Sequence, residues 1–585
     1  MSIPSLRIAR VALALMFAAM LAACGGGGEV TVEAPKSAVA TTNLRALPAE
    51  YLARKAVAYS PFRTATNAQD RDNETITAIM VKEDLDLLVA GDFRLIRLFD
   101  SSDKVAKLVL DVIADNSLDI KVQLGAYVNT YKFVANPYTV IDIKAANQAE
   151  LDRLVALSTN PKYKDIVLAV SVGNETMVSW STVPIDPADM AVYIKSVRDR
   201  VTQPVTTDDN FLFFTNPIPK LITDQIDFAA IHTYPNIDTQ FPSGDLYWDW
   251  KQEAVPPGPA RAVAMMDESI VQTRRQYQLV RDAFDSIGLS AVPIVITETG
   301  WNAVDKGNQK FRAHPVNQKM YVTRLETLRA EGRVGPGPAN IFYFEAFDEP
   351  WKLGDDGWGL FSVLRKARYV VQNLYSPGIW DNPALTDADA VYFVRPTINP
   401  VFAANRYTMY SDAAGAVVTA GLGPFVFNNG ATAGFNVSDN SIATPDGTVS
   451  MRITPTPLDY GWGLLYRSDA TTVNLSDFAA SGTLNFLVKT SYPGKIEVGL
   501  STLTIEGDEQ EVYLQIGNGD FGYCNTDGWC QVSIPLQAFQ AKNPAINFRL
   551  VVSRFIIADR YSFTGKALNS NITTRLNIDG IYYSR

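Results

Sequence analysis

The clearest indication of the fold is the stretch Pro293-Ile294-Val295-Ile296-Thr297-Glu298-Thr299-Gly300-Trp301-Asn302. Residues Ile294–Thr297 are all apolar or β-branched, which is typical of a parallel strand buried on both faces. Glu298 follows at the end of this strand, two residues before Gly300. An acid in this position lies where (β/α)8-barrel proteins carry their functional groups. An isolated Glu could also be an ordinary solvent-facing charge, so its meaning depends on the rest of the chain.

The chain around this stretch alternates short apolar runs with helical segments from about residue 50 to residue 373. This alternation is typical of consecutive parallel βα units, and eight such units in about 320 residues predict a (β/α)8 barrel. The predicted strands are Val57–Tyr59, Phe93–Phe99, Lys121–Tyr127, Ile166–Val172, Val205–Thr207, Asp227–His232, Ile294–Thr297 and Ile341–Phe344.

Polar and aromatic residues follow several of these strands. They include Arg97 near the end of the second strand, Asn174-Glu175 after the fourth, His232-Thr233-Tyr234 at the sixth, and Glu345 to Lys352 after the eighth. Because the carboxyl ends of parallel barrel strands open onto one face, the sequence predicts a functional site there, with Glu298 among its residues.

The N-terminus has the features of an export signal. Arg7 and Arg10 precede an apolar run over residues 11–23, which is short for a membrane span but suits a secretory signal. The run ends at Cys24 and is followed by four glycines, as in a bacterial lipoprotein signal in which this cysteine is acylated. A plain signal peptide with an incidental Cys24 is the alternative. We expect residues 25–48 to be a flexible tether and the protein to be exported and lipid-anchored, with the outer membrane favoured because Gly25 is not acidic.

The composition of the chain limits the kinds of function that it can have. The chain of 585 residues has a net charge of -10 and no basic cluster, so nucleic acid is not an expected partner. The two histidines, His232 and His314, lie in unrelated contexts, which argues against a histidine metal site or a Ser-His-Asp triad. Cys524 and Cys530 are close enough in sequence for a disulfide in an exported protein. We predict carboxylate chemistry, no organic cofactor and no catalytic metal.

The pattern changes after Asn373. We expect a barrel domain over residues 49–375, a linker over 376–404, and a β-sandwich over 405–585, because short strands alternate there with turns rich in Gly, Asn, Pro and Asp. The sandwich resembles the galactose-binding-like jelly rolls attached to bacterial glycosidases. Its residues Tyr460, Trp462, Tyr466 and Trp529 are candidates for a sugar-binding face, or alternatively for the core. A structural calcium is possible in such sandwiches, but no acidic loop indicates one.

The motifs of the barrel resemble glycoside hydrolase family 17, the β-1,3-glucanase family. The resemblance covers residues 50–375 and is carried by Val172-Gly-Asn-Glu175, Thr297-Glu-Thr-Gly-Trp301 and Phe344-Glu-Ala-Phe-Asp-Glu-Pro-Trp-Lys352. The last segment is similar to the bacterial branch and differs from plant members, so plant substrate preferences do not transfer.

The resemblance implies that Glu298 is a nucleophile and Glu175 a general acid/base, the pair required for glycoside hydrolysis with retention. Asn174 would bind the sugar 2-hydroxyl, or simply cap the strand end. Arg97 and Tyr234 would keep the nucleophile ionised and oriented, although Arg97 could instead belong to an ion pair in the barrel floor.

Further residues follow from the same resemblance. Glu349 and Lys352 match the family's additional acid and lysine, with Glu345 as a possible substitute for Glu349. His232 would line the cleft or serve as a structural histidine. The expected stacking platforms for sugar rings are Trp301 and Trp351, with Trp358 either a third platform or a core residue.

The expected function is hydrolysis of β-1,3-glucan by a monomer. One alternative is a transglycosidase with the same residues, in which a second sugar intercepts the intermediate. The other is a non-catalytic glucan-binding lipoprotein. The sequence leaves open endo or exo action and β-1,3 or mixed linkage.

Overall fold

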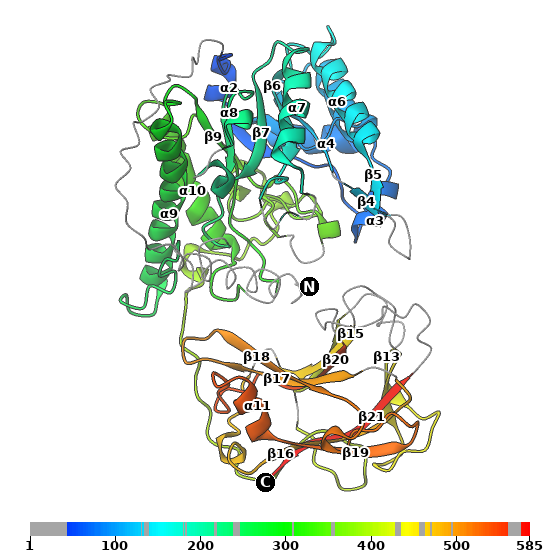
Figure 1. The fold of residues 1–585 in the computed structure, drawn as a ribbon. Coiled ribbons are helices and arrows are strands. Elements are labelled where there is room, and N and C mark those ends of the chain that lie inside the picture. Colours follow the sequence, from blue (N-terminus) through cyan, green and yellow to red (C-terminus); the bar gives the residue numbers. More distant parts are fainter. Residues whose placement is uncertain are drawn as a thin grey trace, which may run out of the picture. The chain divides into compact units, whose positions relative to one another are not determined.

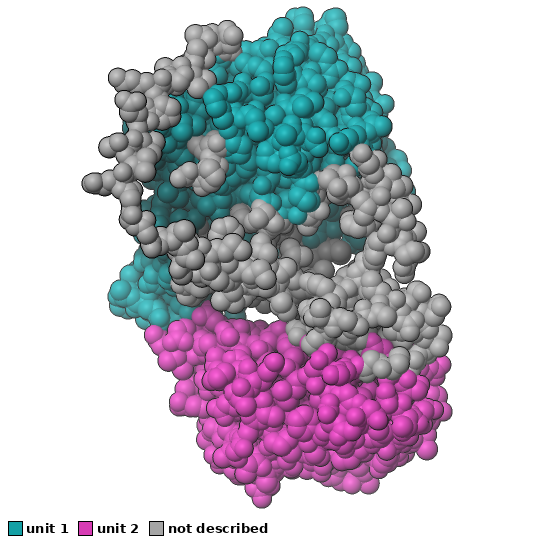
Figure 2. Space-filling model, viewed as in Figure 1, with its two compact units in different colours: residues 1–393 teal, residues 394–585 magenta. Residues whose placement is uncertain are grey.

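The computed structural model describes residues 44–129, 131–133, 140–178, 181, 184–215, 219–237, 246–306, 309–352, 357–419, 421–427, 435–454, 462–468, 471–492, 495–559 and 575–585. The predicted signal, its Cys24 and nearly all of the predicted tether lie outside these residues, as does Tyr460. The described chain forms two compact units that meet in sequence at Phe393 and Val394 (Figures 1 and 2). None of the described helices is long and apolar enough to cross a membrane.

The first unit is a closed barrel of eight parallel strands, which confirms the predicted fold. In barrel order the strands are β1 (Lys55–Ala58), β10 (Ile341–Tyr343), β9 (Ile294–Thr299), β8 (Ala229–His232), β7 (Val205–Asn210), β6 (Val167–Asn174), β3 (Lys121–Ala126) and β2 (Phe93–Leu98). All residues of β7, β8, β9 and β10 are buried, as expected for strands covered on both faces. A separate hairpin of β4 (Tyr131–Phe133) and β5 (Val140–Asp142) follows β3.

Helices surround the barrel, and α9 and α10 lie side by side (Figure 1). They are α3 (Ala68–Asn73), α4 (Ala78–Ala90), α5 (Leu108–Asp115), α6 (Lys144–Thr159), α7 (Pro187–Arg198), α8 (Lys220–Thr223), α9 (Pro259–Ser286) and α10 (Pro315–Gly332). Local sequence explains where several begin. Asp186 and His314 cap α7 and α10 through their side chains, and each is followed by a proline at the first helical position.

The barrel interior is packed with apolar side chains near the amino ends of its strands. Alternate strand residues such as Leu95, Val295 and Phe342 point inward and form one buried cluster. Tyr51, from the short helix α2 (Ala49–Ala53), packs against Phe228 and Phe342 in this cluster. The barrel is therefore closed at the end opposite the carboxyl ends of its strands.

The first unit extends further than the predicted barrel domain. Residues 376–393 were expected to begin a linker, but they pack on the barrel unit. Asn317 of α10 exchanges two hydrogen bonds with the backbone of Val391, and Phe393 is buried against Trp250. The Pro and Asp residues of this segment, which are typical of a connector, concealed the anchoring role of Phe393.

The second unit consists of two antiparallel sheets around one hydrophobic core, as predicted. One sheet contains β13 (Phe435–Asp439), β14 (Ser450–Ile453), β21 (Leu576–Ser584), β16 (Thr483–Thr490) and β19 (Trp529–Pro535), with β11 (Arg406–Tyr410) also paired to β21. The other contains β12 (Gly423–Phe427), β15 (Trp462–Arg467), β20 (Ser553–Asp559), β17 (Ile496–Leu503) and β18 (Glu509–Ile516). Helix α11 (Leu536–Lys542) follows β19.

Details of this unit differ from expectation. Strand β20 begins only at Ser553, because the preceding residues 547–550 form a turn closed by a hydrogen bond from the Leu550 N–H to the Asn547 carbonyl. Tyr466 is buried in the core and does not belong to a binding face. Cys524 and Cys530 are joined by a disulfide, with their Cα atoms 5.9 Å apart.

Candidate active site

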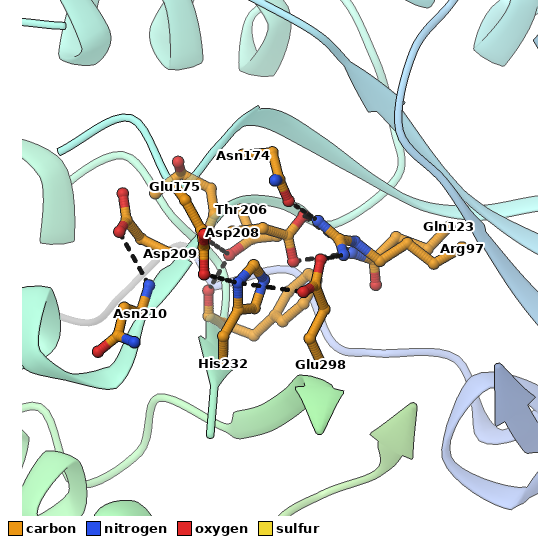
Figure 3. A network of polar contacts seen from close by, with 12 residues as sticks. Arg97, Gln123, Asn174, Glu175, Thr206, Asp208, Asp209, Asn210, His232 and Glu298 are labelled. Carbon is orange, nitrogen blue, oxygen red and sulfur yellow. Dashed lines mark hydrogen bonds and ion pairs between the residues drawn. The ribbon is translucent and has the colours of Figure 1, made fainter. Parts of the chain in front are cut away.

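The carboxyl ends of β6, β8 and β9 bring Glu175, His232 and Glu298 together (Figure 3). One carboxylate oxygen of each acid and one imidazole nitrogen lie within 4.8 Å of one another. The parallel register pairs His232 directly with Glu298 on the neighbouring strand. The two acids, which lie 123 positions apart in the sequence, therefore face one another as predicted.

Glu298 is held as an anion. Its Oε1 accepts a short hydrogen bond from the guanidinium of Arg97, and its Oε2 accepts one from the Tyr234 hydroxyl at 2.7 Å. Burial alone would raise the pKa of Glu298, but His232, Arg97 and the Tyr234 hydrogen bond together hold the pKa below its ordinary value. The predicted roles of Arg97 and Tyr234 agree with this geometry.

Arg97 also contacts polar residues in the barrel interior. Its second terminal nitrogen donates to Asn174 Oδ1 at 2.5 Å and lies 3.3 Å from Asp208 Oδ2. Asp208 in turn accepts from Gln123 Nε2, and the Tyr51 hydroxyl donates to Gln123 Oε1 at 2.5 Å. Both predicted alternatives for Arg97 thus hold at once, since it contacts the nucleophile candidate and also forms a buried ion pair.

Glu175 is the more accessible of the two acids. Its side chain is 38% exposed, whereas that of Glu298 is 7% exposed. The turn that carries Glu175 has an unusual backbone, with Gly173 at φ +84° and Glu175 itself at φ +49°. This left-handed conformation costs little at a glycine but is unfavourable at a glutamate. The turn aims the Glu175 carboxylate at His232 Nδ1, which lies 2.9 Å from Oε1.

His232 connects the two acids. Its ring is fully buried, and Nδ1 lies 2.9 Å from Glu175 and 3.6 Å from Glu298. Burial alone would lower the pKa of His232, but the charge of Glu298 and the hydrogen bond and charge of Glu175 raise it. His232 therefore lies within the candidate site, between the two acids.

Gly300 and Trp301 follow the end of β9, the strand that carries Glu298. A Cβ at position 300 would come within 2.3 Å of the Phe344 carbonyl oxygen, so only glycine allows β9 and β10 to approach here. Trp301 then points inward. It is fully buried, it donates to the Arg312 carbonyl at 2.8 Å, and its ring packs on Tyr321. The prediction that Trp301 is a stacking platform for sugar is therefore wrong.

The segment after β10 forms a second buried cluster of charges. Lys352 Nζ donates to Glu345 Oε2 at 2.7 Å and also pairs with Glu349. Neither acid replaces the other, since both contact the same lysine. Trp351 is half-buried, donates to Glu349 at 3.1 Å, and has the guanidinium of Arg71 4.5 Å from its ring centroid. Trp358 is buried against Tyr234 and belongs to the core.

The two acids beside Lys352 have opposite shifts. Burial, which outweighs the lysine charge, raises the pKa of Glu345 well above its ordinary value. Burial would also raise the pKa of Glu349, but the charge of Lys352 and the hydrogen bonds with Glu345, Lys352 and Ser60 together lower it. One lysine therefore compensates one carboxylate, and Glu345 is the acid that stays protonated.

We expect Glu345→Gln to become more stable relative to wild type as pH rises above about 4.5. The unfolded chain releases the Glu345 proton near that pH while the folded protein retains it, so the free energy of unfolding of wild type falls as pH rises. The limiting slope is about 1.4 kcal/mol per pH unit. Chemical denaturation followed from pH 4 to pH 8 measures the difference.

Glu349→Gln is the matched control, and its dependence should have the opposite sign. Because the pKa of Glu349 is lowered in the folded state, its contribution to stability is present above about pH 4.5 and is lost as pH falls below that value. A difference between Glu345→Gln and wild type that does not vary with pH would contradict the assignment of the proton to Glu345.

Sequence reasoning missed Asp208 and Asp209. The predicted strand ended at Thr207, whereas β7 continues through Asp208, Asp209 and Asn210, all of them buried. Two consecutive acids at the end of a buried strand were the available signal. Asp208 pairs with Arg97, and Asp209 lies beside the Glu175 turn (Figure 3).

Two groups of side chains among the described residues have ligand atoms close enough together to hold a cation. One is Glu175, Glu298 and His232, where the positive charge of Arg97 already neutralises Glu298. The other, Asp412, Asp446 and Asp579, is in the second unit and draws on three separate segments, which is why no acidic loop was visible in the sequence. Acidic groups of this kind are common without an ion, and the expectation of no cofactor stays a prediction.

Comparison with known proteins agrees with both units. Residues 56–360 match the family described as BtgE/BtgC glycoside hydrolase domain, and residues 410–575 match carbohydrate binding domain 30. An endo-laminarinase structure from Formosa Hel1_33_131 aligns with a TM-score of 0.48 and 23% identity, over 58% of this chain and 90% of that one.

Two curated relatives are also similar to the barrel unit. A glucan endo-1,3-beta-glucosidase from Nicotiana tabacum (basic vacuolar isoform GLB) is 28% identical over 189 residues, which is 30% of this chain and 47% of the relative. A glucan 1,3-beta-glucosidase from Arthroderma benhamiae is 23% identical over 243 residues, 39% of this chain and 68% of the relative. The chain thus spans about half the length of the first relative. Since the family match covers more than half of the 585 residues and contains the whole candidate site, the chain belongs to the BtgE/BtgC glycoside hydrolase family.

Proposed function

We propose that this chain is an exported, lipid-anchored retaining glycosidase that hydrolyses β-1,3-glucan. Glu298 acts as the nucleophile and Glu175 as the general acid/base. The observation that carries the proposal is the pairing of two acids whose nearest oxygens lie within 4.8 Å but whose surroundings differ. Retaining glycosidases keep their carboxyl groups about 5–5.5 Å apart, whereas inverting enzymes keep them about 6.5–9.5 Å apart.

The different surroundings assign the two roles. Glu298 is buried, neutralised by Arg97 and held by Tyr234, which suits an anion that must attack the anomeric carbon. Glu175 is more exposed and faces the imidazole of His232, which suits a group that must exchange its proton with substrate and water. Asn174, oriented by Arg97, is placed to bind the sugar 2-hydroxyl beside the nucleophile.

The choice of β-1,3-glucan rests on the curated relatives, both named for β-1,3-glucan cleavage. The match of residues 410–575 to a carbohydrate binding domain supports a second unit that holds the same polymer near the barrel. Trp529, half-buried and fixed by a hydrogen bond to Ala443, is the described aromatic that best suits a sugar contact. The lipid anchor rests on Cys24 and the export signal in the sequence.

The purified protein should release laminari-oligosaccharides from laminarin and nothing from cellulose. Proton NMR during the first minutes should show the new reducing ends in the β configuration, because retention preserves the configuration of the cleaved bond. New reducing ends that first appear as the α anomer would exclude the retaining assignment. Products longer than an oligosaccharide substrate would show transfer to a second sugar instead of hydrolysis.

A further inference from the structure

The turn that carries Glu175 is held from the neighbouring strand β7. The backbone N–H of Glu175 donates to the Asp208 carbonyl at 2.9 Å, and the backbone N–H of Met177 donates to Asp209 Oδ2 at 2.8 Å. The other oxygen of Asp209 accepts from the backbone N–H of Asn210 at 2.8 Å. Asp209 is fully buried and thus reaches the turn from inside the protein (Figure 3).

This anchor matters because the turn is strained. Glu175 has a left-handed backbone at φ +49°, which a glutamate adopts only when its surroundings impose it. The hydrogen bond from Met177 to Asp209 lies two residues beyond Glu175 and fixes the direction in which the chain leaves the strained position. Asp209 therefore helps to determine where the Glu175 carboxylate points.

Asp209 also brings a second titratable group next to Glu175. The charged and titratable groups that face it are Glu175 from the β6 turn and His232 from β8. Glu175 itself faces Asp209 and His232, with Glu298 beyond the imidazole.

We propose that Asp209 is a positioning residue for the acid/base: its buried carboxylate fixes the turn that carries Glu175 and so directs the Glu175 carboxyl group toward the leaving group. The inference rests on the proposed function, since it assumes that Glu175 is a general acid. If the turn moves, Glu175 donates its proton to the leaving group less effectively, whereas Glu298 on β9 keeps its position. Burial and the charge of Glu175 raise the pKa of Asp209 to about 7.

The test compares two substrates that differ only in their need for an acid. A laminari-oligosaccharide has a sugar leaving group that must be protonated, whereas 2,4-dinitrophenyl β-laminaribioside has a leaving group that departs unaided. Asp209→Asn weakens the anchor, because a carboxamide has one acceptor oxygen for the two backbone N–H groups, of Met177 and Asn210, from which the carboxylate accepts. We expect kcat/KM on the oligosaccharide to fall by roughly tenfold or more, a part of the 10²–10⁴ that general acid catalysis contributes, with little change on the dinitrophenyl substrate.

Asp208→Asn is the matched control on the same strand. It disturbs Arg97 and hence the nucleophile, so its kcat/KM should fall on both substrates alike.

Each outcome decides the matter. Equal losses on both substrates, or no loss on either, would overturn the role of Asp209. Wild type and Glu298→Ala run in parallel separate this failure from that of the proposed function, which fails if wild type is inactive or if Glu298→Ala is as active as wild type.

If Asp209→Asn does not fold, Asp209→Glu supplies the test, because it keeps the carboxylate but displaces it from the two N–H groups by one methylene. The loss should again be confined to the oligosaccharide, and equal losses on both substrates would overturn the role of Asp209.

Discussion

Replacing Glu298 with Ala should lower kcat/KM on laminarin by on the order of 10⁴-fold or more, the scale of loss when the nucleophile of a covalent enzyme is removed. The physical reason is that, among the described residues, neither of the other acids near the site can take the place of the nucleophile. Glu175 lies on the opposite side of the scissile bond, and Glu345 is buried and protonated beside Lys352. Initial rates with reducing-end detection measure the loss.

Azide distinguishes the two acids by the configuration of the product. In Glu298→Ala, azide can fill the space of the missing carboxylate and attack directly, giving an α-glycosyl azide. In Glu175→Ala the glycosyl-enzyme still forms with an activated substrate, and azide then attacks it from the other face to give a β-glycosyl azide. NMR of the products assigns the roles, and the reverse pattern would mean that the nucleophile and the acid/base are exchanged.

Arg97→Met should have the largest effect on stability and a large effect on rate. Arg97 is 1% exposed and is shared by Glu298 and Asp208, which are both buried. Removing the cation leaves two carboxylates without compensation, and breaking a buried pair in this way typically costs about 3–5 kcal/mol. Denaturant unfolding of the variant and wild type gives the difference directly.

The pH dependence of kcat/KM should also differ between Arg97→Met and wild type. Arg97 is one of the groups that lower the pKa of Glu298, so without it the nucleophile takes up a proton at higher pH. The acidic limb of kcat/KM is therefore expected to move upward.

Arg94→Met is the matched control, because Arg94 lies on the same strand but forms an exposed ion pair with Asp119, which contributes less than about 1 kcal/mol. An Arg97→Met variant as stable as Arg94→Met would show that the buried pair is not needed.

The barrel could be predicted because its strands are buried on both faces, and such strands appear in a sequence as uninterrupted apolar runs. The same reasoning placed Glu175 and Glu298 on one face, since it needs only the rule that parallel strands end together. It failed at β7, where Asp208 and Asp209 interrupt the apolar run although they are as buried as the residues before them. Buried acids depend on partners such as Arg97, and a single sequence does not show which partner is near.

Side-chain direction was the other limit. Trp301 was expected to contact sugar, and Trp358 either to contact sugar or to lie in the core, because aromatic rings pack well on sugars; both are buried in the core. Position along the chain fixes which strand end a residue follows, while the turn geometry after Gly300 fixes where its ring points. The lysine between Glu345 and Glu349 shows the same limit, since the sequence offered the two acids as alternatives and the fold uses both.

The backbone at Glu175 has a consequence for how this protein would respond to selection. A left-handed glutamate costs of order 1 kcal/mol, and a glycine at the same position would remove that cost. Heat resistance and turnover therefore make opposite demands on one residue, a trade-off between stability and activity. A mutant library screened only for survival of heating would be enriched in Glu175→Gly, and the most durable members would be those that can no longer donate a proton to the bond they bind.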